Sequence, residues 1–115
     1  MGTNYFLVHN RPTVNPPMHI GKSSIGWRFL FQAVDFDWQN TFEGFGKIQT
    51  FPQWKRMILE TTGDGRAVIM DEYDEIVKAD DFFQMVAKKQ EEQNEDNFAY
   101  ADNIDGYRFS HEDFS

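Results

Sequence analysis

The segment WRFLFQAV, residues 27–34, decides how the rest of this 115-residue sequence is interpreted. Apolar side chains recur at every second position, which is the period of a β-strand with a buried face. The residues on that face are Trp27, Phe29, Phe31 and Ala33. Leu30 and Val34 stand on the other face and indicate that it is partly buried as well. We therefore predict a largely buried strand here.

The preceding segment HIGKSSIG, residues 19–26, contains Gly-Lys-Ser, which resembles the end of a phosphate-binding loop. That loop requires another glycine five positions before Gly21, so that backbone N–H groups can surround the phosphates. The residue at this position is Pro16, which has no N–H. The loop should also open a long helix, whereas this segment precedes a strand. We therefore interpret Gly-Lys-Ser-Ser as a turn after a short strand at residues 18–22, and we expect no nucleotide site.

Two helices are predicted downstream from their capping residues and apolar stripes. The first begins at a Thr50 cap with Gln53 in the capping-box position, and it ends at Gly63 and Gly65. Its predicted buried stripe is Trp54, Met57 and Ile58. The second helix is predicted to open at Asp80 or Asp81. Its predicted buried stripe is Phe82, Met85 and Val86.

The remaining pattern completes a single α+β domain over residues 1–115, with a small antiparallel sheet and two helices. Further strands are predicted at residues 4–9, 67–70, 75–77 and 107–110. Residues 35–49 mix aromatic residues with glycines and are predicted to form a structured loop. Residues 94–106 are acidic, polar and rich in turn formers, and we predict a mobile loop there.

Composition excludes several classes of site. There is no cysteine, so disulfides, thiolate metal ligands and cysteine nucleophiles are absent. The first residues show no cationic patch followed by an apolar run, and no stretch approaches the roughly 20 apolar residues of a membrane span. We therefore expect a soluble, cytoplasmic protein without a membrane partner, and no cofactor is expected. The oligomeric state stays open.

Charge is distributed unevenly along the chain. Residues 1–70 carry 7 Lys or Arg against 5 Asp or Glu, whereas residues 71–115 carry 4 against 14. An acidic second half repels nucleic-acid phosphates, which makes nucleic acid an unlikely partner and favours a protein with a basic surface. The alternative is that these carboxylates only form a solvated, solubilising face. The predicted partner-binding residues are Asp80, Asp81, Glu95, Asp96, Phe98, Tyr100, Asp102 and Asp105.

Two other functions stay open. A nucleic-acid module would use the mildly basic first part, with Trp27 or Trp54 stacking on bases. Its cationic candidates are Lys22, Arg28, Lys47, Lys55 and Arg56. A small metal-dependent enzyme would instead require histidines and aspartates to converge in space. Its candidates are His9, His19, His111, Asp35 and Asp37, although their spacing matches no recognised ligand pattern, so no metal site is assigned.

The segments MGTNYF, HIGKSSIGWRFLF, MDEYDEIV and a terminal DFS resemble a group of small bacteriophage proteins. Members of that group carry a Cys-x-x-Cys knuckle between the first strand and the HIGKSS block, where this chain has RPTVNPP, residues 11–17. The resemblance implies a phage protein in the host cytoplasm, but it supplies no activity or catalytic residue. We therefore expect a non-enzymatic protein that binds and inhibits or modulates a host protein, such as an anti-CRISPR or anti-restriction inhibitor. Its acidic surface would then act as a DNA mimic.

Overall fold

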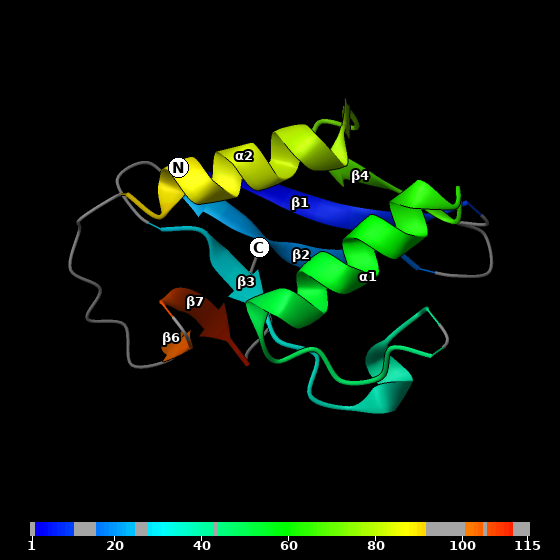
Figure 1. Cartoon of the computed structure of the whole chain (residues 1–115), viewed down its shortest axis with the longest axis horizontal. Coiled ribbons are helices and arrows are strands. Elements are labelled where there is room, and N and C mark those ends of the chain that lie inside the picture. The colour runs from blue at the N-terminus through cyan, green and yellow to red at the C-terminus, as the bar shows by residue number, and fades with distance from the viewer. Residues whose placement is uncertain are drawn as a thin grey trace.

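A mixed β-sheet with two helices on one of its faces forms the molecule (Figure 1). The computed structural model describes residues 2–10, 16–24, 28–42, 44–91, 101–104 and 106–111, with the side chains of 101–103 left out. The strands within these ranges are β1 (Gly2–His9), β2 (Met18–Ser24), β3 (Leu30–Gln32), β4 (Ala67–Asp71), β5 (Ile76–Val77), β6 (Ala101–Ile104) and β7 (Tyr107–Ser110). The helices are α1 (Phe51–Gly63), α2 (Ala79–Lys89) and a short 3-10 helix, η1 (Asp37–Gln39). The predicted α+β class is confirmed.

The strands lie in the order β5-β4-β1-β2-β3-β7-β6. All pairs are antiparallel except β3 and β7, which run parallel with Phe31 opposite Phe109. The predicted strand at residues 27–34 is shorter than expected, because only Leu30–Gln32 pair continuously. Val34 instead forms an isolated bridge with Ile48 in the following loop. Both faces are buried as predicted, since Leu30 and Val34 are 8% and 5% exposed.

The interpretation of Gly-Lys-Ser-Ser as a turn is wrong. These residues continue β2 to Ser24 and pair with β1, where Gly21 lies opposite Tyr5. Close packing, not a turn, explains why position 21 is a glycine. A Cβ added to Gly21 would overlap the Leu30 carbonyl oxygen and lie 2.5 Å from a Phe29 ring carbon. An extended strand of this kind offers no loop of N–H groups for a phosphate.

Residues 101–104 also differ from the prediction. They form β6, which pairs with β7 in a hairpin, rather than part of a mobile loop. Gly106 lies in the connecting turn with a φ of 86°, a conformation that glycine adopts without steric cost. The rest of the predicted mobile loop, residues 94–100 and 105, lies outside the described residues.

The first helix is confirmed in its caps and in its buried stripe. The Thr50 hydroxyl accepts the Gln53 N–H, and the Gln53 side chain accepts the Thr50 N–H in return. The second helix begins at Ala79 with Lys78 at the N-cap, so Asp80 and Asp81 lie in its first turn and do not cap it. Carboxylates there still stabilise the helix through its dipole.

Both helices cover the same face of the sheet and enclose an aromatic core (Figure 1). Trp54 of α1 is fully buried and its indole N–H donates to the Gln32 carbonyl of β3 at 2.9 Å. Phe31 stacks on Phe109 with ring centroids 5.3 Å apart, which joins β3 to β7 through side chains as well as backbone. The high aromatic content is thus largely used for core packing.

Candidate functional site

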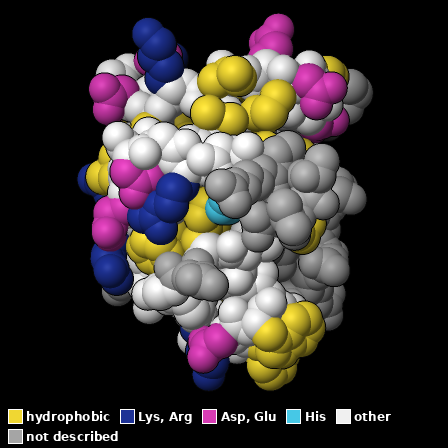
Figure 2. Space-filling view, turned by 90° about the vertical axis from the view of Figure 1, so that its right-hand side faces the viewer, with side chains coloured by type: hydrophobic (Ala, Val, Ile, Leu, Met, Phe, Trp, Pro, Cys, Tyr) yellow, Lys and Arg dark blue, Asp and Glu magenta, His cyan; other side chains and the backbone are white. Residues whose placement is uncertain are grey.

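One end of the molecule combines exposed carboxylates with exposed apolar side chains. It is formed by the β4–β5 turn, the edge strand β5, the start of α2 and the last turns of α1. We call it the acidic edge, and its exposed residues are Leu59, Val68, Glu72, Tyr73, Asp74, Glu75, Ile76, Asp80 and Asp81. Figure 2 shows this end, with hydrophobic side chains between acidic ones over the upper part of the view.

Hydrogen bonds around Asp71 fix the shape of the turn. The Asp71 carboxylate accepts the N–H groups of Tyr73 at 2.9 Å and Glu75 at 3.0 Å. Backbone bonds run from the Asp71 N–H to the Glu75 carbonyl and from the Asp74 N–H to the Asp71 carbonyl. Asp74 adopts a φ of 63°, which Asp tolerates better than most residues. The turn therefore holds Tyr73, 67% exposed, away from the sheet.

On the same edge, a groove of about 390 Å³ opens between the end of α1, the first residues of β4 and the segment from β5 into α2. Buried Ala67 and Ile69 of β4 line it, together with exposed Leu59 of α1. The other lining residues are Thr62, Gly63, Val68, Ile76, Val77, Lys78, Ala79 and Asp80. Most of this surface is aliphatic, and a carboxylate, Asp80, stands in the wall. The groove can therefore accept an apolar group next to a positive charge.

Of the predicted partner-binding residues, the structure places Asp80 and Asp81 on this edge. Glu95, Asp96, Phe98, Tyr100 and Asp105 lie outside the described residues. Asp102 belongs to β6, and its side chain is also outside the description. The carboxylates of the β4–β5 turn were counted in the acidic half but were not selected as binding residues from the sequence.

The residues predicted for nucleic-acid binding are mostly engaged with other protein groups. Lys55 lies over the rings of Phe51 and Phe83, at 6.0 Å and 5.7 Å from their centroids. Arg56 pairs with Glu60 at 2.8 Å and also lies 5.2 Å from the Phe45 ring.

Arg28 donates to the Gly106 carbonyl at 2.8 Å. Lys22 belongs to β2, and Lys47 lies near enough to Asp35 to stabilise its carboxylate.

Trp54 cannot stack on bases, because it is fully buried and bonded to β3. Trp27 lies outside the described residues. The tryptophan that the structure does expose is Trp38 of η1, which is 78% exposed and stacks on Phe36. The sequence gives no periodic signal for it, since DFDWQ lies in an irregular loop.

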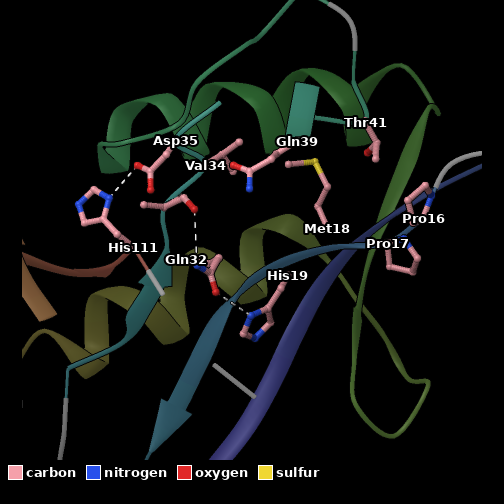
Figure 3. Close-up of a pocket in the computed structure, with 11 residues that line it drawn as sticks. Pro16, Pro17, Met18, His19, Gln32, Val34, Asp35, Gln39, Thr41 and His111 are labelled. Carbon is pink, nitrogen blue, oxygen red and sulfur yellow. Dashed lines mark hydrogen bonds and ion pairs between the residues drawn. The ribbon is translucent and has the colours of Figure 1, made fainter. Parts of the chain in front are cut away.

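A second hollow, of about 340 Å³, gathers several polar candidates (Figure 3). His19 of β2 and Asp35, which follows β3, lie in its wall with His111, which follows β7. The Nδ1 atom of His111 donates to Asp35 Oδ1 at 2.7 Å, and Gln49 donates to the same oxygen at 3.0 Å. The Gln49 hydrogen bond, with smaller contributions from His111 and Lys47, lowers the pKa of Asp35, while burial opposes this effect.

His19 is held on the other side of this hollow by amide oxygens. Its Nε2 lies 2.8 Å from Asn4 Oδ1, and its Nδ1 lies 3.4 Å from Gln32 Oε1. Figure 3 shows His19 and Gln32 next to each other, with the His111–Asp35 pair apart from them. Of the five candidate metal ligands, His9 and Asp37 do not line this hollow. No group of three such ligands able to hold a metal ion occurs among the described residues.

Sequence reasoning missed the groove. It named Asp35 and His111 among five residues that could converge, but it did not identify these two, which are 76 positions apart, as the pair that meets. The available signal for the acidic edge was the segment MDEYDEI, residues 70–76, where Tyr73 and Ile76 stand among carboxylates. Within the described part of the chain, neither helix has the length and hydrophobicity needed to cross a membrane. Comparison with known protein families, curated proteins and solved structures finds no match to this chain.

Proposed function

We propose that this chain is a protein-binding module whose acidic edge occupies a basic surface of another protein. The observation that carries this proposal is the combination of exposed carboxylates and exposed apolar side chains on one edge. Tyr73 and Ile76 are 67% and 68% exposed; Tyr73 lies between Glu72 and Asp74, and Ile76 directly follows Glu75. Carboxylates steer a basic partner and exclude an acidic one, whereas apolar anchors supply most of the binding free energy.

The alternative interpretation of the carboxylates as a solubilising face does not account for the apolar residues. A surface that only keeps a protein in solution has little use for large exposed hydrophobic groups. Four of the six large hydrophobic residues exposed in the described part of the chain lie on this edge: Leu59, Val68, Tyr73 and Ile76. The concentration of both types of group on one edge favours binding.

The resemblance to bacteriophage proteins supports a more specific proposal. In that setting, the partner is a host protein, and the module inhibits it by covering a basic surface that would otherwise bind nucleic acid. Carboxylates arranged along an edge imitate the charge of a phosphate backbone. Anti-restriction or anti-CRISPR inhibition is the most concrete version of this mechanism, and it needs no catalytic residue.

A paired set of charge variants tests the proposal. The acidic-edge variant is Glu75→Gln and Asp80→Asn, and its matched control is Asp37→Asn and Glu91→Gln, two exposed carboxylates that lie off this edge. Each variant removes two carboxylates, so the change in net charge is identical. Tagged full-length proteins would be used to capture partners from nuclease-treated host lysate, and circular dichroism would verify that both variants fold.

We expect a basic protein that the wild type and the control retain and that the acidic-edge variant loses. Exposed charge pairs near an interface contribute mainly to association rate, so retention should also decrease with rising salt. Equal retention by all three proteins would show that these carboxylates do not mediate the contact. Loss of the captured protein on nuclease treatment would instead favour the nucleic-acid module.

A further inference from the structure

The groove between α1, β4 and β5 has the form of an anchor site for a single side chain. Its floor is built on the sheet, because Ile69 is fully buried and pairs with Val77 of β5. Its volume of about 390 Å³ lies near the lower end of the roughly 300–1,000 Å³ typical of ligand pockets. A groove of this size accepts one large apolar side chain with its adjacent backbone.

The exposed residues around the groove leave apolar surface available to a partner. Leu59, Val68 and Ile76 line it and are 43%, 40% and 68% exposed. Burying apolar surface contributes about 25 cal/mol per Å², so covering these side chains favours association. Residues with this environment are the usual centre of an interface, surrounded by a polar rim.

The charged residues on and beside the groove determine the charge of the occupant. Asp80 and Lys78 line the groove, and Glu75 and Asp81 are exposed and adjoin the lining residues Ile76 and Asp80 in the sequence. The N-terminus of α2 would by itself favour an anion, but Asp80 and Asp81 already stand in its first turn. Together with Lys78, the three carboxylates give these four described residues a net charge of −2. A cationic segment is therefore the complementary occupant.

We infer that this groove binds a basic peptide segment of the partner through one large aliphatic or aromatic side chain with Lys or Arg on either side of it. This inference rests on the proposed function and names the recognition element of the same edge. A second copy of this chain is a poorer occupant, because each copy carries a net charge of −8 and would bring like charges together.

Selection from a display library of short random peptides on the full-length protein tests the inference. We expect selected peptides to share one Leu, Ile, Phe or Trp flanked by Lys and Arg. One such peptide, labelled with a fluorophore, and its copy with Ala at the anchor position are then measured by anisotropy. Replacing the anchor should weaken binding at least about tenfold, as expected for a hot-spot residue.

Protein variants connect the peptide to the groove. Leu59→Ser and Ile76→Ser change exposed side chains and should weaken binding of the labelled peptide at least about tenfold. Trp38→Ser is the matched control, because Trp38 is 78% exposed but lies in η1, away from the groove. It should leave the affinity unchanged.

The possible failures are distinguishable. Peptides that bind through charge alone, unaffected by Leu59→Ser and Ile76→Ser, would overturn the anchor site but leave the acidic edge as a binding surface. Selected peptides that bind the acidic-edge charge variant equally well would contradict the proposed function too. Sedimentation showing a wild-type dimer that Ile76→Ser dissociates would identify a second copy as the occupant and overturn the peptide inference.

Discussion

Gly21 shows how a single missing side chain allows two strands and an aromatic ring to approach each other. The position has no room for a Cβ, because the Leu30 carbonyl and the Phe29 ring occupy that space. Gly21→Ala should therefore destabilise the fold by about 1–3 kcal/mol, the usual cost of overpacking a core. Urea denaturation followed by circular dichroism measures this change.

Gly63→Ala is the matched control for this substitution. Gly63 lies in the last turn of α1, and a Cβ there meets nothing within 4 Å. Alanine should be neutral or stabilise the helix by about 0.5–1 kcal/mol. Equal losses in the two variants would contradict a packing requirement for glycine at position 21 between β2 and β3.

The lowered pKa of Asp35 predicts how the free energy of unfolding depends on pH. Its pKa is lowered from the ordinary value of 3.8, first by the Gln49 hydrogen bond and then by His111. A carboxyl whose folded pKa is depressed contributes stability above its unfolded pKa and loses it as the pH falls through the folded value. The free energy of unfolding should therefore fall more steeply in acid for the wild type than for Asp35→Asn.

Urea denaturation of both proteins from neutral pH down to below pH 3.8 measures this difference. The difference in the free energy of unfolding between wild type and Asp35→Asn should be constant near neutral pH and should become smaller in acid. A difference that stays constant over the whole range would contradict a depressed pKa at Asp35. His111→Asn serves as a second probe, because it removes the imidazole but retains a hydrogen-bond donor.

At the scale of the element, the first helix depends on its capping box. The Thr50 hydroxyl accepts the Gln53 N–H at 3.4 Å, and Gln53 Oε1 accepts the Thr50 N–H at 3.1 Å. Thr50→Ala should cost about 1 kcal/mol of stability, as is usual for loss of an N-cap. Thermal denaturation checks this, and Thr50→Ser should restore most of the loss. A serine variant as unstable as the alanine variant would exclude the cap as the cause.

Helices were predictable because their signals are local. Caps, stripes and terminal glycines lie within one segment, so α1 was predicted almost residue by residue, whereas α2 began one or two residues earlier than expected. Strand β2 was predicted to end at Lys22, two residues too early, because Gly-Lys-Ser-Ser was interpreted as a turn. The requirement for glycine at position 21 comes from β3 and Phe29, which only the folded chain brings close.

Pairing between distant strands could not be predicted from local patterns. The parallel pair β3–β7 joins Leu30 to Arg108, and no periodicity in either strand identifies its partner. Strand β6 was missed for a related reason, because three of its four residues, Ala101, Asp102 and Asn103, are poor strand formers and the strand depends on β7 for pairing. The acidic composition of residues 101–104 led to the prediction of a mobile loop, whereas pairing with β7 makes these residues a strand.

At the scale of the whole molecule, the sequence indicated that the candidate surface is negatively charged, but it did not indicate where that surface lies. The acidic second half was evident from composition, and Asp80 and Asp81 lie on the acidic edge. The groove, by contrast, is assembled from α1, β4, β5 and α2, whose contacts are tertiary. The same limit applies to the hollow lined by His19, Asp35 and His111, which three separate strands bring together.

The parallel pairing of β7 with β3 also determines the order in which the molecule can be completed during synthesis. Strands β1 to β5 and both helices leave the ribosome before residues 107–110. The edge of β3 that faces β7 therefore has no hydrogen-bonding partner until β7 has been synthesised. Until then, Phe31 lacks the ring of Phe109 that covers it in the finished fold. A nascent chain arrested before β7 therefore presents an open strand edge and an uncovered aromatic side chain, the features that lead to aggregation and chaperone capture.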